Sequence, residues 1–226
     1  MADATAMTLR DEALLTALFC RAMRHAGDAL FEMTGRTVEI ATPEMRRCTP
    51  SEVLELAGGA DALVVSVYVG ITGGISGHAL LVLPVVGAFR LADRLVEDLL
   101  EGDCRPAPLA DAADPFVALA GLPELDDLHR SALLELGNVT IAAALNELGD
   151  HLGSPIHPTV PEAVTEYAGA VLDAVLLDLV SAADDVLAAR TVFLEGADTV
   201  DGTLLVLPRS DSLSDLVSAA GMPRWP

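Results

Sequence analysis

An internal repeat is the feature that most constrains how this chain can fold. The segments Ala79-Leu-Leu-Val-Leu-Pro84 and Thr203-Leu-Leu-Val-Leu-Pro208 are nearly identical, and their residue numbers differ by 124. The segments Val38-Glu-Ile-Ala-Thr-Pro43 and Ile156-His-Pro-Thr-Val-Pro161 differ by 118, and each follows a long segment with helical periodicity. We therefore predict a twofold repeat, at about residues 8–101 and 122–220, with a small insertion in the second half. The alternative is two unrelated halves that contain similar strand sequences.

Both halves have the same predicted order of secondary structure: a long helix, a strand, a helix, two strands and a helix. The predicted helices cover residues 8–34, 49–56, 88–100, 122–148, 162–180 and 212–220. The predicted strands cover residues 37–42, 60–71, 77–84, 155–160, 185–194 and 202–208, and the first of them stops at Pro43. Each half has too few strands to bury a sheet face alone. We therefore expect residues 1–226 to form a single α/β domain, of the α+β kind, whose halves share one sheet.

The charge of the chain excludes some classes of partner. It has 34 acidic and 13 basic residues, for a formal net charge of -21, and every basic residue is arginine. Such a surface repels nucleic acid and anionic lipid, and the low aromatic content of 4% disfavours base stacking. The composition instead suits a basic protein partner or a cytoplasm of high salt concentration.

The cysteines and the apolar segments predict a cytoplasmic protein. The N-terminal residues lack the basic and apolar regions of a secretory signal. The most apolar segments, residues 79–89 and 168–180, are too short or too interrupted by charge to span a membrane. Cys20, Cys48 and Cys104 are odd in number and widely spaced, which is typical of reduced thiols rather than of a disulfide framework or a zinc site.

Three polar residues form a stripe on the second long predicted helix. Ser131, Glu135 and Asn138 are spaced i, i+4 and i+7, so they lie on one side of that helix. Gly137 lies among them, although glycine within a helix costs about 1 kcal/mol relative to alanine. Its presence is explained if another backbone approaches the helix closely there. A polar stripe of this kind is, by itself, most often only a solvated helix face.

The stripe becomes informative together with Pro161. The pattern Ser131-x3-Glu135-x2-Asn138, followed by 22 residues and then Pro161, resembles the signature of the CheC/CheX/FliY phosphatase family of bacterial and archaeal chemotaxis. The resemblance covers nearly the whole chain, and the arrangement in two halves is most similar to CheC. It implies a pseudo-twofold fold in which two long helices pack on one side of a shared, mostly antiparallel sheet.

The resemblance also implies an activity and a division of roles. The substrate would be the aspartyl phosphate of a phosphorylated CheY-like response regulator, and the chain would be a hydrolase. Asn138 would position the attacking water, and Glu135 would pair with a lysine of the receiver. Ser131 and Pro161 would support the site, by shaping the helix face and ordering a strand end. The Mg²⁺ would be supplied by the receiver, so the chain itself would need no metal or other cofactor.

The first half departs from this pattern. The shift of 118 places Ala13, Ala17 and Cys20 at the positions of the serine, glutamate and asparagine. This departure keeps open a second hypothesis, a non-catalytic CheC-like adaptor that binds phosphorylated CheY, CheD or a motor switch component. A third is a receiver phosphatase that acts outside chemotaxis.

The remaining candidate residues carry weaker signals. His151 and His157, with Asp150, lack a firm third partner for a metal ion. His78 and His129 are isolated in sequence and are interpreted as structural or solvated. Residues 73–77 contain neither the spacing of a nucleophile elbow nor the lysine of a phosphate-binding loop.

Overall fold

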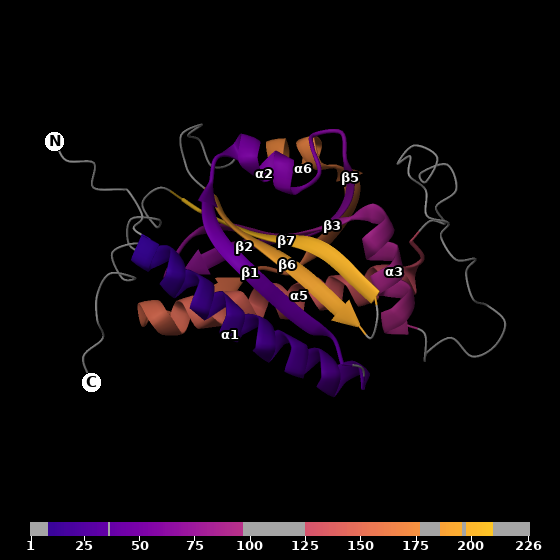
Figure 1. Ribbon diagram of the computed structural model, residues 1–226, viewed down its shortest axis with the longest axis horizontal. Helices are drawn as coiled ribbons and strands as arrows, with labels where there is room; N and C mark the ends of the chain where they lie inside the picture. Colours follow the sequence, from indigo (N-terminus) through magenta and orange to yellow (C-terminus); the bar gives the residue numbers. More distant parts are fainter. Residues whose placement is uncertain (1–8, 36, 97–124, 177–185, 196–197, 210–226) are drawn as a thin grey trace.

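The computed structural model describes residues 9–35, 37–96, 125–176, 186–195 and 198–209 (Figure 1). The described helices are α1 (Leu9–Thr34), α2 (Pro50–Leu56), α3 (Val85–Val96), α5 (Asp127–Leu152) and α6 (Ala168–Leu176). The described strands are β1 (Glu39–Cys48), β2 (Leu63–Gly73), β3 (Gly77–Pro84), β4 (Ile156–Pro158), β5 (Glu162–Tyr167), β6 (Val186–Glu195) and β7 (Asp198–Pro208). The helix predicted at residues 212–220 lies outside the described residues.

The described strands form one seven-stranded sheet in the order β1-β6-β7-β3-β2-β4, with β5 also paired to β2, and every pairing is antiparallel. The halves interlock, because β1 pairs with β6 of the second half while β4 and β5 pair with β2 of the first. At the centre, Leu80 pairs with Leu205 and Leu81 pairs with Leu204. Adding 124 to the residue numbers of the first half turns Leu80 into Leu204 and Leu81 into Leu205, so each pair maps onto the other. A twofold axis between β3 and β7 requires this relation. The predicted fold class, with two halves sharing a sheet, is confirmed.

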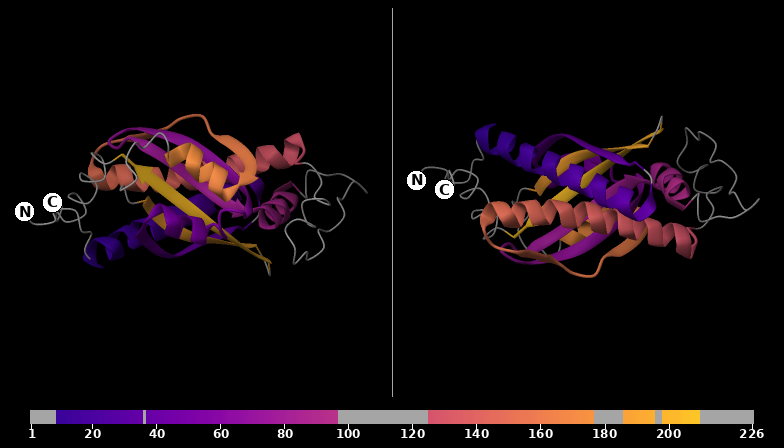
Figure 2. Two further views of the ribbon diagram at one scale, coloured as in Figure 1. Left: turned by 90° about the horizontal axis from the view of Figure 1, so that it is seen from above. Right: turned by 90° about the horizontal axis from the view of Figure 1, so that it is seen from below.

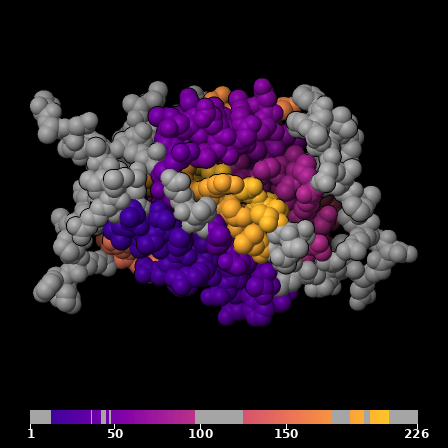
Figure 3. All heavy atoms as spheres, in the orientation of Figure 1, coloured from indigo at the N-terminus to yellow at the C-terminus, as the bar shows by residue number. Residues whose placement is uncertain are grey.

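The helices cover the two faces of this sheet unequally. The long helices α1 and α5 lie side by side on one face, and α3 lies at one end of the same layer (Figures 1 and 2). The larger apolar core fills the space between these helices and the sheet. On the opposite face, α2 and α6 pack over a smaller apolar cluster. In the space-filling view, the gold surface of the C-terminal strands is visible between α2 and α1 (Figure 3).

The two long helices are equivalent in the repeat. Each has 26 residues, and they begin at Leu9 and Asp127, which differ by 118. The two helices therefore have equal length and start at positions related by the same shift as the repeat segments. α5 starts after the N-cap residue Asp126 and ends at Gly153, whose φ of 68° is the left-handed conformation of a helix C-terminus. The helix therefore begins and ends a few residues later than the predicted range of 122–148.

Two predictions around the edge strands are wrong. β1 does not stop at Pro43, because its register with β6 shifts between Ala41 and Glu44 and one extra residue forms a bulge there. Residues 162–167 form strand β5 rather than the beginning of a helix, and α6 begins only at Ala168. Pairing with the neighbouring strand β2 outweighs the local helical preference of this segment.

Gly137 lets α5 lie close to the sheet. A Cβ atom built on this glycine would be 2.5 Å from the Cβ atom of Val67 on β2, which is far shorter than a normal contact. The sequence predicted that another backbone approaches the helix here, but the close neighbour is the side chain of Val67.

We expect Gly137→Ala to lower the free energy of unfolding by about 1–3 kcal/mol, because overpacking this contact costs more than the better helix propensity of alanine returns. Urea denaturation of the full chain, followed by circular dichroism, measures the change. Ser131→Ala, an exposed substitution on the same helix, should not lower the denaturation midpoint. A Gly137→Ala variant as stable as the wild type would show that α5 can move away from β2 at little cost.

Candidate functional site

The polar stripe predicted from the sequence lies on the open side of α5. We call Ser131, Glu135 and Asn138 the α5 stripe. Ser131 and Glu135 are exposed and Asn138 is half-buried, whereas Leu133 and Leu136 on the opposite side are fully buried in the core. No other described residue forms a hydrogen bond or ion pair with the side chains of the α5 stripe. A carboxylate and a carboxamide, one helical turn apart, are thus accessible to a partner molecule.

Polar contacts to neighbouring elements hold both ends of α5. Near its beginning, the guanidinium of Arg130 donates to the backbone carbonyl of Ala163 on β5, at 2.7 Å. Near its end, the buried carboxylate of Glu147 accepts from Nε of Arg21 on α1, at 2.6 Å, and lies 3.3 Å from Nδ1 of His25. This hydrogen bond and the charge of Glu147 raise the pKa of Arg21. The helix that carries the stripe is therefore fixed against β5 on one side and α1 on the other.

Pro161 lies in a bulge of the edge strand that contacts α5. Between β4 and β5, residues 159–161 lie opposite only residues 69–70 of β2. Proline is tolerated there because a bulge on an edge strand does not need its missing backbone N–H. The bulge near Pro43 in β1 is its counterpart in the repeat. Since the first half keeps the proline without the glutamate and asparagine, the shape of the edge strand alone explains this residue.

The same bulge exposes an apolar side chain. Val160 is 82% exposed, more than any other large apolar residue that the structure describes. The edge strand on which it lies contacts α5. The chain thus exposes polar groups on α5 and an apolar side chain between β4 and β5, the two edge strands that pack against this helix.

The equivalent residues of α1 are exposed to the same degree, but they lack the carboxylate and the carboxamide. Ala13 and Ala17 are exposed and Cys20 is half-buried, in the same order as the three residues of the α5 stripe. The first half therefore has the same three positions on its long helix, but they carry neither a carboxylate nor a carboxamide.

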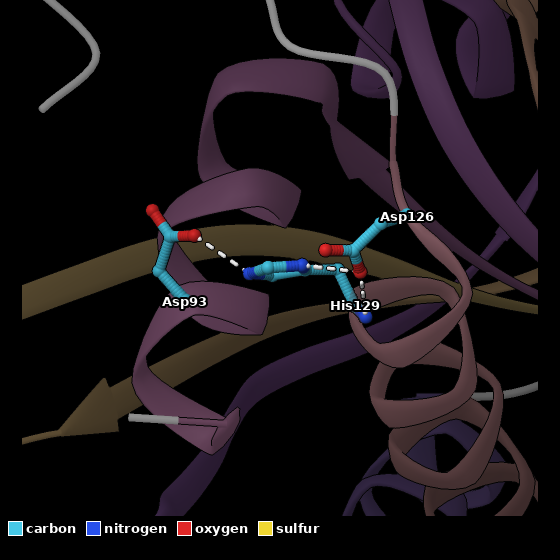
Figure 4. Close-up of polar contacts among 3 residues, drawn as sticks. All are labelled: Asp93, Asp126 and His129. Atoms are coloured by element: carbon cyan, nitrogen blue, oxygen red, sulfur yellow. Dashed lines mark hydrogen bonds and ion pairs between the residues drawn. The ribbon is translucent and has the colours of Figure 1, made fainter. Parts of the chain in front are cut away.

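One polar cluster was not predicted. His129 is not isolated, because its ring lies between the carboxylates of Asp126 and Asp93 (Figure 4). The spacing of Asp126 and His129 is that of a helix N-cap and its third residue, which is a signal present in the sequence. Asp93 comes from α3, and no sequence pattern links it to this histidine.

The described residues form neither a metal-binding cluster nor a membrane-spanning helix. Among the residues that the structure describes, no group of three or more His, Cys, Asp or Glu side chains could hold a metal ion. His151 is half-buried and His157 is exposed, and they form no such group. No described helix combines the length and the hydropathy needed to cross a membrane.

Comparison with known proteins gives a sequence relative and several structural neighbours. No protein-family model matches the chain. The CheY-P phosphatase CheC of Bacillus subtilis (strain 168) is 24% identical over 199 residues, which cover 87% of each protein. Thermotoga maritima FliY superposes with a TM-score of 0.68 at 18% identity, covering 95% of this chain and 98% of that one. A chain of the FliM-SpeE complex from H. pylori gives a TM-score of 0.66 at 12% identity, with coverages of 96% and 100%.

These comparisons show the fold of the chain and a resemblance in sequence. The fold is that of Thermotoga maritima FliY and of the matched chain of the FliM-SpeE complex, and each superposition covers nearly the whole chain. The resemblance to the CheC/CheX/FliY family, which the stripe and Pro161 indicated, is confirmed by the similarity to CheC over most of both sequences.

Proposed function

We propose that this protein hydrolyses the aspartyl phosphate of a CheY-like response regulator. The observation that carries the proposal is the open position of Glu135 and Asn138 on α5, in a chain whose sequence resembles a CheY-P phosphatase over 87% of its length. An acyl phosphate is already reactive, so catalysis requires mainly positioning and stabilisation of charge. Neither task needs a strong base or a covalent intermediate.

Asn138 suits the positioning of water. Its carboxamide has both donor and acceptor groups, so it can hold a water molecule in line with the phosphorus atom. Its half-buried position on a fixed helix limits the rotamers available to the amide. The backbone of α5 therefore sets the direction from which the water attacks.

Glu135 suits docking. Its exposed carboxylate lies one turn before Asn138 and can form a charge-assisted hydrogen bond with a lysine of the receiver. Val160 on the adjacent edge strand provides an apolar contact at the rim of the same surface. Ser131 borders the contact, and Pro161 maintains the bulge that carries Val160. The Mg²⁺ of the reaction would be the receiver's own ion.

The second candidate is an adaptor that binds the phosphorylated receiver or CheD without hydrolysis. The observation that favours it is the replacement of the glutamate and asparagine by Ala17 and Cys20 in the first half. Phosphate release from the host's own phosphorylated receivers, with and without the full chain, separates the two functions. The phosphatase accelerates the loss of phosphate, whereas the adaptor binds the receiver and leaves the rate of loss unchanged.

Glu135→Ala should weaken receiver affinity about tenfold and lower the hydrolysis rate at limiting concentrations, because a charge-assisted contact is lost on docking. Isothermal titration with a receiver activated by beryllofluoride measures the affinity. Glu55→Ala, which removes an exposed carboxylate from α2 on the opposite face of the sheet, is the control and should bind like the wild type. An equal loss of receiver affinity in Glu135→Ala and Glu55→Ala would mean that binding depends only on the net charge of the protein.

A further inference from the structure

β5, with the short β4 before it, forms the edge of the described sheet on the side opposite to β1. It pairs with β2 and with no other described strand, and it lies along the outer margin of the molecule (Figure 2). An edge strand keeps one row of backbone N–H and C=O groups unpaired, and that row can accept a further strand. The register of β5 therefore decides which of its backbone groups a partner could reach.

The hydrogen bond at the end of β5 defines this row. The backbone N–H of Ala168 donates to the carbonyl of Ala62 at 2.8 Å, in continuation of the register between β5 and β2. In an antiparallel pair, residues that exchange hydrogen bonds with the partner alternate with residues whose backbone groups point away from it. The even-numbered residues of β5 therefore bond to β2, whereas the N–H and C=O groups of Ala163, Thr165 and Tyr167 face outward.

Two of these outward groups already have side-chain partners. The carbonyl of Ala163 accepts from the guanidinium of Arg130 at 2.7 Å. The N–H of Tyr167 donates to the carboxylate of Glu166 at 2.9 Å. Both contacts agree with the outward direction of the odd-numbered residues. The N–H and C=O groups of Thr165, in the middle of the row, have no such partner among the described residues.

The side chains around this edge are apolar and acidic. Val160, Val164 and Tyr167 are three of the six large apolar residues that the structure describes as exposed. Their concentration within residues 160–167 is typical of an interaction surface rather than of scattered surface residues. Glu162 and Glu166 are exposed on either side of Val164, on the same face of the strand.

Charge decides which kind of strand fits this edge. A second copy of the chain would bring its own Glu162 and Glu166 opposite or diagonal to the same two residues, and each chain has a formal net charge of -21. Like charges on paired strands repel, whereas opposite charges stabilise the pair. The edge therefore favours a basic segment over a second copy of this chain.

We propose that the outer edge of β5 binds an extended, basic segment of a partner protein, which joins the sheet as a further strand. The backbone of that segment exchanges hydrogen bonds with Thr165. Its lysine or arginine side chains pair with Glu162 and Glu166, and an apolar residue between them covers Val164. Arg130 limits the pairing at the beginning of β5, because it already binds the strand there. The inference does not depend on the proposed function, since none of these groups belongs to the α5 stripe.

The test adds a synthetic peptide to the full chain labelled with nitrogen-15. The probe is the capped peptide Thr-Thr-Lys-Thr-Val-Thr-Lys-Thr-Thr, in which two lysines flank a valine at alternate positions. At about 50 mM salt, it should shift the amide signals of Thr165 and Tyr167, with a dissociation constant below about 1 mM. The amide signals of β1, the other edge strand, should not shift, because β1 exposes Arg46.

Two control peptides separate strand addition from simple charge attraction. Glutamate in place of both lysines should weaken binding at least about tenfold, because the charges then repel. N-methylation of the two threonines beside the valine keeps the charges and removes the backbone donors that face Thr165. It should also weaken binding about tenfold.

A pair of double variants tests the acidic residues. Glu162→Gln with Glu166→Gln should lower the affinity for the lysine peptide at least about fivefold, because both charge-assisted contacts are lost. Glu32→Gln with Glu55→Gln is the matched control. It removes two exposed carboxylates from α1 and α2 and should bind the peptide like the wild type.

Three results would overturn the proposal: no shift at β5 with the lysine peptide, equal binding of the N-methylated peptide, or an equal loss of affinity in the control variant. Sedimentation of the wild type tests the alternative occupant. A dimer whose dissociation on dilution shifts the amide signal of Thr165 would assign this edge to a second copy of the chain and would also contradict the proposal.

Discussion

Asn138→Ala should slow the loss of phosphate from a phosphorylated receiver by at least about a hundredfold, because in the proposed function the attacking water loses its positioning group. Receiver affinity should change less than about twofold, since alanine leaves the docking carboxylate of Glu135 in place. Phosphate release under single-turnover conditions and titration with a beryllofluoride-activated receiver measure the two quantities. Asn146→Ala is a matched control, because it removes an exposed carboxamide farther along the same helix.

Comparing the rate of phosphate loss with the receiver affinity separates the positioning of water from the binding of the receiver. Loss of activity that follows loss of affinity would show that Asn138 only helps the proteins to dock. An active Asn138→Ala variant would remove this residue from the mechanism. A loss of activity in the Asn146 control would point to the helix as a whole rather than to one amide.

The second large effect is a gain of function. In an inactive Asn138→Ala background, the double change Ala17→Glu and Cys20→Asn should restore phosphate release to well above the background rate. The reason is geometric: these positions match Glu135 and Asn138 in the repeat and have the same exposure, and the adjoining edge strand carries the equivalent bulge. The same single-turnover assay detects the restored activity.

Each single change in the Asn138→Ala background is the control for this experiment. Neither should restore activity, because docking and water positioning require both groups. No activity in the double variant, with an active wild type, would show that the equivalence of α1 and α5 does not extend to the contact with the receiver. Activity from Ala17→Glu alone would mean that added negative charge, rather than the pair, promotes the reaction.

The repeat made much of the fold predictable. The segments ending in Pro84 and Pro208 identified the central strands β3 and β7, and the shift of 118 aligned α1 with α5. The edge strands were predicted less well. Their bulges depend on pairing with β2 and β6, and local propensity gives no signal for such long-range contacts.

The candidate site was predictable where it depends on spacing along one helix. The i, i+4, i+7 pattern placed Ser131, Glu135 and Asn138 on one side of α5, although only the structure shows that this side is open. The cluster of Asp93, His129 and Asp126 was only half predictable. The cap spacing to Asp126 is local, whereas the contact with Asp93 depends on the packing of α3 against α5, which no spacing encodes.

In the proposed function, Glu135 and Asn138 of α5 enter the phosphorylated pocket of a receiver. A double-mutant cycle tests it most directly, by combining Glu135→Ala with alanine at the receiver's active-site lysine and measuring all four affinities by titration. A direct contact predicts that the two losses are coupled by at least about 1 kcal/mol, or about fivefold in affinity. Additive losses, within about 0.3 kcal/mol, would contradict the claim, because they would place Glu135 away from that lysine.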